Sequence, residues 1–224
     1  MGTPHEHHIT VPRTARYYTL GTAGADTRAV WIVAHGYGQL AGDFIARFSA
    51  VDDGAHLIVA PEALNRYYHD TRPGASSTSL VGATWMTKED RSSEIADQVT
   101  YLDALYAAIF REVARDTVRV TALGFSQGVA TIARWLSHTR LPIDRTIFWA
   151  GVLPDETLPS ADTALRRSEV VLVYGLRDEF ATAERVARQV TSFRDADKSF
   201  TQMEFAGGHR LDDETLRTLA LNDR

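Results

Sequence analysis

Short runs of apolar residues recur along the chain, and most of them end at a glycine or a proline. The clearest runs lie at residues 29–34, 56–60, 117–123, 146–150 and 169–174, and weaker ones lie at 16–20 and at about 199–205. Continuous apolar runs of this length are typical of strands that are buried on both faces of a sheet. The sequence therefore predicts a strand at each of these places.

Amphipathic patterns fill the intervals between the predicted strands. Within residues 89–114, apolar positions recur at helical spacing, at Ile95, Val99, Leu102, Leu105, Ile109 and Val113. Shorter helices are predicted at residues 42–50, from Ser126 to about Ser137, at about 180–193 and at about 212–221. Strands that alternate with helices form βαβ units, so the predicted class is α/β, with a mostly parallel, twisted sheet and helices on both faces.

Residues 61–86 fit neither pattern. This segment holds prolines, glycines, a Ser/Thr cluster at 76–79 and several large side chains, namely Tyr67, Tyr68, Leu80, Trp85 and Met86. A long loop in a compact domain is usually functional or disordered, and the aromatic residues favour an ordered excursion over a cleft. With no linker or repeat elsewhere, residues 1–224 are predicted to form one domain that carries this aromatic excursion near its active-site cleft.

The strongest chemical motif is G-F-S-Q-G, from Gly124 to Gly128. It sits between a predicted strand and a predicted helix, where a G-x-S-x-G pentapeptide places its serine on a sharp, strained turn. The small residues two before and two after Ser126 let the strand and the helix approach each other. The turn lifts the serine hydroxyl out at the carboxyl edge of the sheet, so Ser126 is the candidate nucleophile.

A serine hydroxyl needs a base, and His209 is the best candidate among eight histidines. It follows the last predicted strand in G-G-H-R-L, where two glycines allow a tight approach. A histidine after the final strand completes the Ser–Asp–His chain order of hydrolases with this elbow. A structural histidine is the alternative, and His5, His7 and His8 lie apart on the N-terminal arm.

The imidazole in turn needs a carboxylate that fixes its tautomer. Asp178 stands just past the strand predicted at 169–174, in Y-G-L-R-D-E-F, and its neighbour Glu179 is the rival. The order Ser126, Asp178, His209 matches the order expected of this fold. The intervals between the three residues each leave room for a helix and a strand, which brings all three loops to one edge of the sheet.

A glycine-rich turn, H-G-Y-G from His35 to Gly38, follows the first long buried strand. In hydrolases of this type, an N–H from that loop and the N–H after the nucleophile bind the oxyanion of the transition state. The candidate donors are therefore the backbone amides of Tyr37 and Gln127. An ordinary glycine turn is the alternative.

Composition and charge narrow the class of protein further. The formal net charge is −5, with 24 Lys and Arg against 29 Asp and Glu, which argues against a nucleic-acid binder. The chain has no cysteine, so disulfides, thiolate metal sites and a cysteine nucleophile are excluded. We expect a cytoplasmic protein without stable membrane insertion, because neither a signal peptide nor an apolar stretch long enough to span a bilayer is apparent.

G-F-S-Q-G, together with H-G-x-G, G-x-x-D and G-H, resembles the phospholipase/carboxylesterase family of α/β-hydrolases, which includes acyl-protein thioesterases and small bacterial carboxylesterases. The resemblance runs from about residue 28 to 220. It implies the α/β-hydrolase fold, the Ser126–His209–Asp178 triad with the Tyr37 and Gln127 amides, and neither a metal nor a cofactor. Gln39 departs from the family, in which many members carry Asp after H-G-x-G.

The expected activity is hydrolysis of a carboxylic ester or thioester through an acyl-enzyme. A lysophospholipid, an acyl-protein, acyl transfer to an acceptor other than water and a catalytically silent ligand-binding protein are alternatives. Metal binding by His5, His7 and His8 is a further open possibility. The oligomeric state, a monomer or a homodimer, also stays open. We expect the acyl pocket to be lined by Tyr67, Tyr68, Leu80, Trp85, Met86 and Phe180, with core packing as the alternative for each aromatic.

Overall fold

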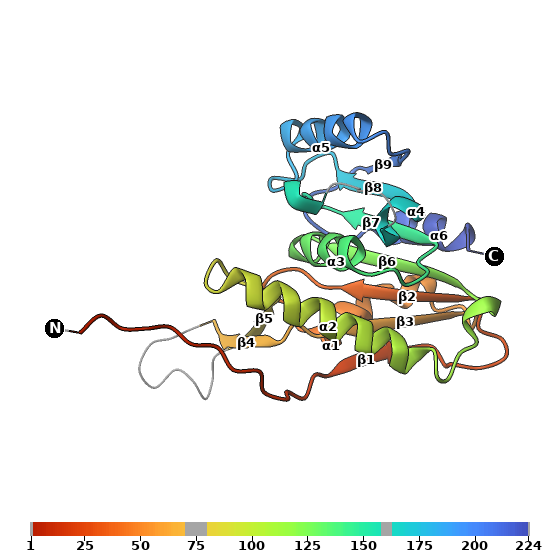
Figure 1. The fold of residues 1–224 in the computed structure, drawn as a ribbon. Helices are drawn as coiled ribbons and strands as arrows, with labels where there is room; N and C mark the ends of the chain where they lie inside the picture. The colour runs from red at the N-terminus through yellow and green to blue at the C-terminus, as the bar shows by residue number, and fades with distance from the viewer. Residues whose placement is uncertain (1, 70–79, 158–162, 224) are drawn as a thin grey trace.

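A computed structural model describes residues 2–69, 80–157 and 163–223, and within them the predicted strands form one sheet (Figure 1). The order across the sheet is β1-β3-β2-β6-β7-β8-β9. Only β1 is antiparallel to its neighbour, β3, and the other described pairs are parallel. The strands are β1 (Tyr17–Leu20), β2 (Ala29–Ala34), β3 (His56–Pro61), β6 (Arg119–Phe125), β7 (Arg145–Trp149), β8 (Glu169–Gly175) and β9 (Thr201–Phe205).

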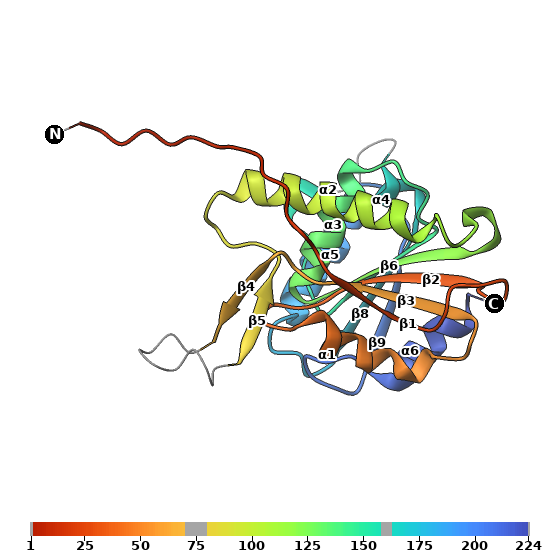
Figure 2. The ribbon, with the colours of Figure 1, turned by 90° about the horizontal axis from the view of Figure 1, so that it is seen from below.

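Helices cover both faces of this sheet, as Figure 2 shows. One face carries α2 (Arg91–Ile109), α3 (Gln127–His138), α4 (Ala164–Arg167) and α5 (Ala183–Asp195), and the other carries α1 (Ala41–Ile45), the 3-10 helix η1 (Ala46–Val51) and α6 (Asp213–Leu221). Short 3-10 turns lie at η2 (Arg115–Thr117) and η3 (Asp155–Thr157). Each face of the sheet has its own buried apolar cluster. The predicted α/β class, with a mostly parallel sheet between helical layers, is confirmed.

The register of the strands brings their carboxyl ends to one edge. Ala34 of β2 pairs with Gly124 of β6, and Gly175 of β8 pairs with Phe205 of β9. The loops that leave these ends therefore start close together. They are the loops in which the sequence places its candidate functional residues.

The long helix predicted within residues 89–114 is shorter in the structure. The long helix ends at Ile109 and not at residue 114. The chain then turns, and Val113 packs into the core from this turn with 5% of its surface exposed. Val113, the last apolar position of the helical pattern, is thus a buried residue of a turn and not of the helix.

The excursion at 61–86 contains a β-hairpin that the sequence did not predict. Its strands, β4 (Asn65–Tyr68) and β5 (Val81–Thr84), pair antiparallel in a second, two-stranded sheet. Each strand has only four residues, and one of them carries Gly82, so the alternation typical of a strand is hard to recognise. The Ser/Thr cluster at 76–79 lies outside the described residues.

A buried ionic cluster lies at the opposite edge of the sheet, near the end of the chain. One oxygen of Asp223, Oδ2, accepts a hydrogen bond from Trp31 Nε1 at 2.6 Å and one from Arg145 Nη2 at 2.7 Å. Its other oxygen, Oδ1, lies 3.1 Å from Arg119 Nε, and His56 Nε2 lies 3.7 Å from Oδ2. The cluster joins Asp223, two residues past the end of α6, to β2, β3, β6 and β7.

The charge of His56 makes part of this stabilisation depend on pH. Burial lowers the pKa of His56, but the carboxylates of Asp223 and Asp53 raise it more, so the pKa lies above its ordinary value of 6.5. The resulting stabilisation is complete below pH 6.5 and is lost as the pH rises through the higher folded-state pKa. We therefore expect His56→Gln to flatten the decline of the free energy of unfolding from pH 6.5 upward. Urea unfolding at several pH values measures this free energy. The prediction is contradicted if the free energy declines with pH equally steeply in the wild type and in His56→Gln.

Candidate active site

Ser126 stands at a sharp turn between β6 and α3. Its backbone angles are φ 53° and ψ −114°, which lie outside the regions that ordinary residues prefer. The turn requires glycine on both sides, because a Cβ on Gly124 would lie 2.4 Å from the Gly128 carbonyl oxygen, and one on Gly128 would lie 2.2 Å from the Ala34 carbonyl oxygen. The pentapeptide thus has the strained strand-to-helix geometry that its sequence predicts.

His209 contacts the serine hydroxyl from the loop after β9. Its Nε2 lies 2.8 Å from Ser126 Oγ. In the neutral imidazole this nitrogen accepts the hydroxyl proton when Nδ1 carries the hydrogen. The geometry therefore places a basic nitrogen within hydrogen-bond distance of the Ser126 hydroxyl.

Asp178 contacts the other side of the same imidazole. His209 Nδ1 lies 2.9 Å from Asp178 Oδ2 and 3.1 Å from Oδ1. The carboxylate also accepts hydrogen bonds at 2.8 Å from the backbone N–H groups of Phe180 and Ala181, which fix its orientation. Glu179, the rival in the sequence, is exposed. Of the two neighbouring carboxylates, the structure thus brings Asp178 to the histidine.

Two aromatic rings contact the imidazole of His209. The ring centroid of Phe125 lies 5.0 Å from that of His209, and the Phe180 centroid lies 4.7 Å from it. Phe125 is 5% exposed and belongs to the core, whereas Phe180 is 56% exposed and forms the outer side. The rings limit rotation of the imidazole, so its two nitrogens stay directed at Ser126 and Asp178.

The two candidate oxyanion amides lie in the turns that follow β2 and β6. Among the described residues, neither the Tyr37 N–H nor the Gln127 N–H has a hydrogen-bond acceptor. The loop of Tyr37 is fixed on both sides, because Gly36 N donates to Gln39 Oε1 at 2.8 Å and Gly38 N donates to the Ala83 carbonyl at 2.8 Å. Gln39, which departs from the family pattern, therefore closes the turn through its side chain.

The side chain of Gln127 joins the nucleophile turn to the hairpin. Its Nε2 donates to Thr84 Oγ1 at 2.9 Å and to the Met86 carbonyl at 3.0 Å, and its Oε1 accepts from Trp85 N at 3.1 Å. The end of β5 thus contacts both turns that carry the candidate amides. Sequence reasoning found the backbone of Gln127 and missed this contact of its side chain.

His35 is a structural residue of the core beneath this loop. It is fully buried, Nε2 accepts from Ala63 N at 3.1 Å, and Nδ1 lies 2.8 Å from the Gly36 carbonyl. Burial lowers its pKa, and the Gly36 carbonyl and Glu62 offset this only in part. A neutral imidazole that donates through Nδ1 and accepts through Nε2 satisfies both contacts.

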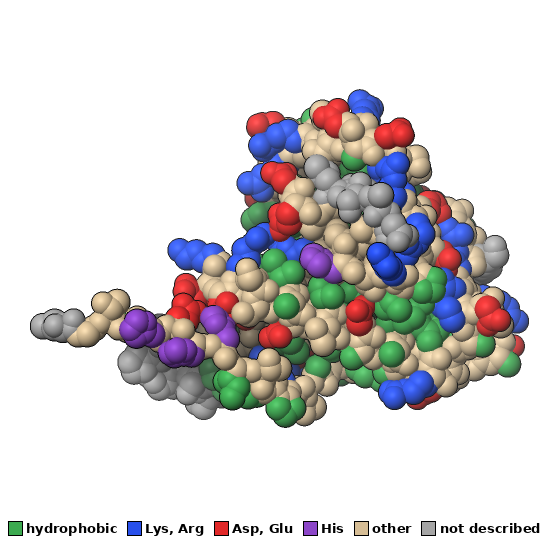
Figure 3. Space-filling model, viewed as in Figure 1, with side chains coloured by type: hydrophobic (Ala, Val, Ile, Leu, Met, Phe, Trp, Pro, Cys, Tyr) green, Lys and Arg blue, Asp and Glu red, His purple; other side chains and the backbone are tan. Residues whose placement is uncertain are grey.

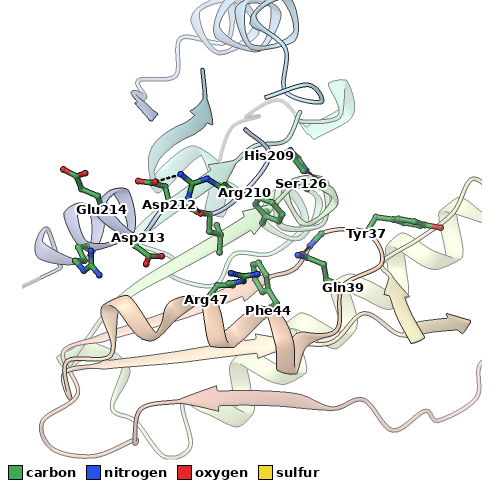
Figure 4. A pocket seen from close by; sticks show the side chains of 14 residues that line it. Tyr37, Gln39, Phe44, Arg47, Ser126, His209, Arg210, Asp212, Asp213 and Glu214 are labelled. Carbon is green, nitrogen blue, oxygen red and sulfur yellow. Dashed lines mark hydrogen bonds and ion pairs between the residues drawn. The ribbon is translucent and has the colours of Figure 1, made fainter. Parts of the chain in front are cut away.

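A cavity of about 690 Å³ opens beside Ser126 and His209 (Figure 4). One wall comes from the loop after β2 and from α1 and η1, and the other comes from the segment that follows His209 and begins α6. The lining residues are Gly36, Tyr37, Gln39, Phe44, Arg47, Phe125, Ser126, His209, Arg210, Leu211, Asp212, Asp213, Glu214 and Arg217.

None of the six residues that the sequence proposed for the acyl pocket is among these lining residues. For Trp85 the proposal is wrong, because its side chain is 1% exposed and donates from Nε1 to the His35 carbonyl at 2.8 Å within the core. Phe180 contacts His209 from outside, and Tyr67 packs against Tyr37 with centroids 5.5 Å apart.

The other three residues belong to the hairpin and the chain that leaves it. Tyr68 and Leu80 are exposed on the hairpin, and Met86 Sδ lies 3.1 Å from Arg134 Nη1. Sequence reasoning missed the charged residues that line the cavity. Those within 210–217 could have been found, because this segment directly follows His209 in the sequence.

The N-terminal arm carries the histidines that the sequence raised as metal ligands. Histidine side chains gather along this arm at the surface in Figure 3. The structure places His8 Nε2 3.3 Å from Glu6 and 3.1 Å from Asp90, without His5 or His7. Among the described residues, these three are the only group with ligand atoms close enough to share a metal ion, and all are exposed. Contacts of this kind are common without a metal.

Several solved structures resemble this chain over nearly their whole length. The esterase PE8 matches with a TM-score of 0.68 and 19% identity, over 94% of this chain and 98% of that one. A phospholipase/carboxylesterase from Dyadobacter fermentans matches with 0.63 and 15%, over 96% and 98%. Acyl-protein thioesterase 2 from Zea mays matches with 0.62 and 16%, over 94% and 100%.

At these identities the likeness establishes the fold, and the chain has the α/β-hydrolase fold that its motifs predict. The matched proteins include the kinds of enzyme that the sequence resembles. Neither a protein-family model nor a curated protein matches the sequence. In the part of the chain that the structure describes, no helix has the length and apolar character needed to cross a bilayer.

Proposed function

We propose that this protein is a serine hydrolase that cleaves carboxylic esters or thioesters through an acyl-enzyme. The observation that carries the proposal is the chain of contacts from Ser126 Oγ to His209 Nε2 at 2.8 Å and from His209 Nδ1 to Asp178 Oδ2 at 2.9 Å. The contacts lie at a strained turn beside an open cavity. The named esterases and thioesterases that share the fold support the proposal.

In the first half of the reaction, Ser126 Oγ attacks the acyl carbonyl while His209 Nε2 takes its proton. The carbonyl oxygen becomes an oxyanion that the N–H groups of Tyr37 and Gln127 bind, and Asp178 stabilises the charged imidazole. The tetrahedral intermediate then collapses. The bond to the leaving oxygen or sulfur breaks, and His209 returns its proton to that atom.

In the second half, a water molecule attacks the acyl-enzyme and gives one proton to His209 Nε2. The same two amides bind the second oxyanion. When this intermediate collapses, the bond between the acyl carbon and Ser126 Oγ breaks and Oγ takes the proton from the imidazole. The products are a carboxylic acid and an alcohol or thiol, with the enzyme restored.

The proposal is tested by hydrolysis of p-nitrophenyl esters with acyl chains from acetate to a long fatty acid, beside the matching thioesters. Ser126→Ala defines the background. We expect turnover by the wild-type protein above this background, with one mole of acid released for each mole of alcohol or thiol. Equal, background-level rates in both proteins across the series contradict the proposal and favour a ligand-binding protein on this fold.

Gln127→Ala is expected to reduce turnover because it displaces the proposed oxyanion amides. The substitution keeps the backbone N–H but removes the hydrogen bonds to Thr84 and Met86. A small displacement of a catalytic group reduces the rate strongly, so we expect kcat to fall about tenfold to a hundredfold with a smaller change in KM. Steady-state kinetics measure both values.

Gln202→Ala, at an exposed position of β9, is the matched control for Gln127→Ala. A wild-type kcat in Gln127→Ala contradicts the positioning role. A thermal unfolding curve of each variant separates loss of the position from loss of the fold.

A further inference from the structure

The cavity beside Ser126 differs from the apolar pocket expected for an acyl chain. Sites for apolar ligands are lined mainly by hydrophobic and aromatic side chains. Here the buried rings of Phe44 and Phe125 form part of the wall, but charged side chains form much of the rest, namely Arg47, Arg210, Asp212, Asp213, Glu214 and Arg217. An alkyl chain in this space would take these charges from water without new partners, which is unfavourable.

The charges on the α6 side are largely offset by one another. Arg210 Nη2 lies 3.2 Å from Asp212 Oδ1. Asp213 and Glu214 lie in the first turn of α6, where carboxylates are stabilised by the helix N-terminus. Arg217 follows four and three residues after these two carboxylates, and no ion pair joins its side chain to a described residue. With two arginines and three carboxylates, this wall has a net negative charge.

Arg47 on the opposite wall has a different environment. It belongs to η1, beside Phe44 and across the cavity from Arg210 and Asp212 (Figure 4). No described residue forms an ion pair or a hydrogen bond with its side chain, Asp43 one turn before it included. A guanidinium group presents paired N–H donors that match a carboxylate or phosphate oxygen pair.

We propose that this cavity binds a polar arm of the substrate that ends in an anionic oxygen group, and that Arg47 binds this group. The proposal rests on the proposed function, since it assigns the substrate class of the same site. The acidic side chains of Asp213 and Glu214 repel an anion from the far part of the cavity. The negative group is therefore held toward Arg47, and the ester bond lies at Ser126.

The test compares esters that differ only in a terminal charge, in each arm of the ester. Ethyl hydrogen adipate and ethyl hexanoate place the carboxylate or its neutral counterpart in the acyl arm. 4-Acetoxybutanoate and butyl acetate place it in the alcohol arm. Hydrolysis is followed by chromatography of the released acid for the wild type, Arg47→Gln, Arg47→Lys and Arg111→Gln, an exposed arginine after α2 as the matched control.

We expect the wild type to prefer the charged ester of one pair. The ratio of kcat/KM values, charged over neutral, is expected to fall about tenfold to a hundredfold in Arg47→Gln, because charge-assisted hydrogen bonds are lost. In Arg47→Lys the ratio is expected to fall less, because lysine keeps the charge. In Arg111→Gln the ratio is expected to stay at the wild-type value. A ratio that Arg47→Gln leaves unchanged, with the neutral esters cleaved, overturns the proposal and leaves the hydrolase function standing.

A binding measurement separates this proposal from the hydrolase itself. Calorimetry of adipate with Ser126→Ala, and with the same protein that also carries Arg47→Gln, needs no turnover. Adipate binding that depends on Arg47 supports the anion site even if no ester in the panel is cleaved. Equal adipate affinity in both proteins, or no binding in either, overturns it.

Discussion

Ser126→Ala is expected to lower kcat/KM for every ester that the wild type cleaves, by about 10⁴- to 10⁶-fold. The substitution removes the proposed nucleophile, the hydroxyl that lies 2.8 Å from His209 Nε2, and changes nothing in the core. The free energy of unfolding is therefore expected to stay near that of the wild type. Steady-state kinetics and urea unfolding of the same preparation measure both quantities.

The carboxylate next to the histidine provides a matched pair of control variants. Asp178→Asn is expected to lower kcat/KM about 10⁴-fold, the effect of the equivalent change in another serine hydrolase, because the amide favours the wrong imidazole tautomer. Glu179→Gln removes the same charge one residue further along, where the side chain is exposed and does not contact His209. A large loss in Glu179→Gln with little loss in Asp178→Asn contradicts the assignment.

Asp223→Ala is expected to reduce the free energy of unfolding by about 3 kcal/mol. Removal of this carboxylate leaves the guanidinium of Arg145, which is 1% exposed, buried without its partner, and it also removes the acceptor for Trp31. We expect the lower end of the range for buried pairs, because Arg145 keeps its hydrogen bond from Nη1 to the Leu219 carbonyl. Urea unfolding monitored by tryptophan fluorescence measures the change.

Asp26→Ala is the control for this loss, because Asp26 is exposed in the loop before β2. It is expected to change the free energy of unfolding by less than about 0.5 kcal/mol. An equally small change in Asp223→Ala shows that the buried ionic cluster does not stabilise the fold. Kinetic constants near those of the wild type are expected for both variants, because the cluster lies at the edge of the sheet opposite the candidate site.

The sheet and the three candidate catalytic positions were predictable because each depends on a local pattern. Apolar runs that end at glycines marked β2, β6 and β8, and the parallel order then brought their carboxyl ends to one edge. The pentapeptide itself predicts the close approach of the backbone at Gly124 and Gly128. Chain order was sufficient to select His209 from eight histidines.

Features that depend on contacts between distant segments were not predictable in this way. The hairpin strands are too short to show alternation, and nothing local indicated that Trp85 would turn inward and donate to the His35 carbonyl. The contact of Asp223 with Trp31 joins two residues that are 192 positions apart in the sequence. The acyl pocket was assigned to aromatic residues because aromatic side chains are a strong sequence signal, whereas the side chains that line the cavity beside Ser126 include Arg47 and Asp213.

The central claim is that Ser126 is a nucleophile activated by His209, and covalent labelling tests it most directly. An alkyl fluorophosphonate reacts with an activated serine and releases fluoride, and intact-mass spectrometry with peptide mapping locates the adduct. We predict one adduct per chain, on Ser126, with no adduct in Ser126→Ala and much slower labelling in His209→Ala. An unlabelled wild-type protein, or an adduct on another residue that persists in Ser126→Ala, would contradict the claim.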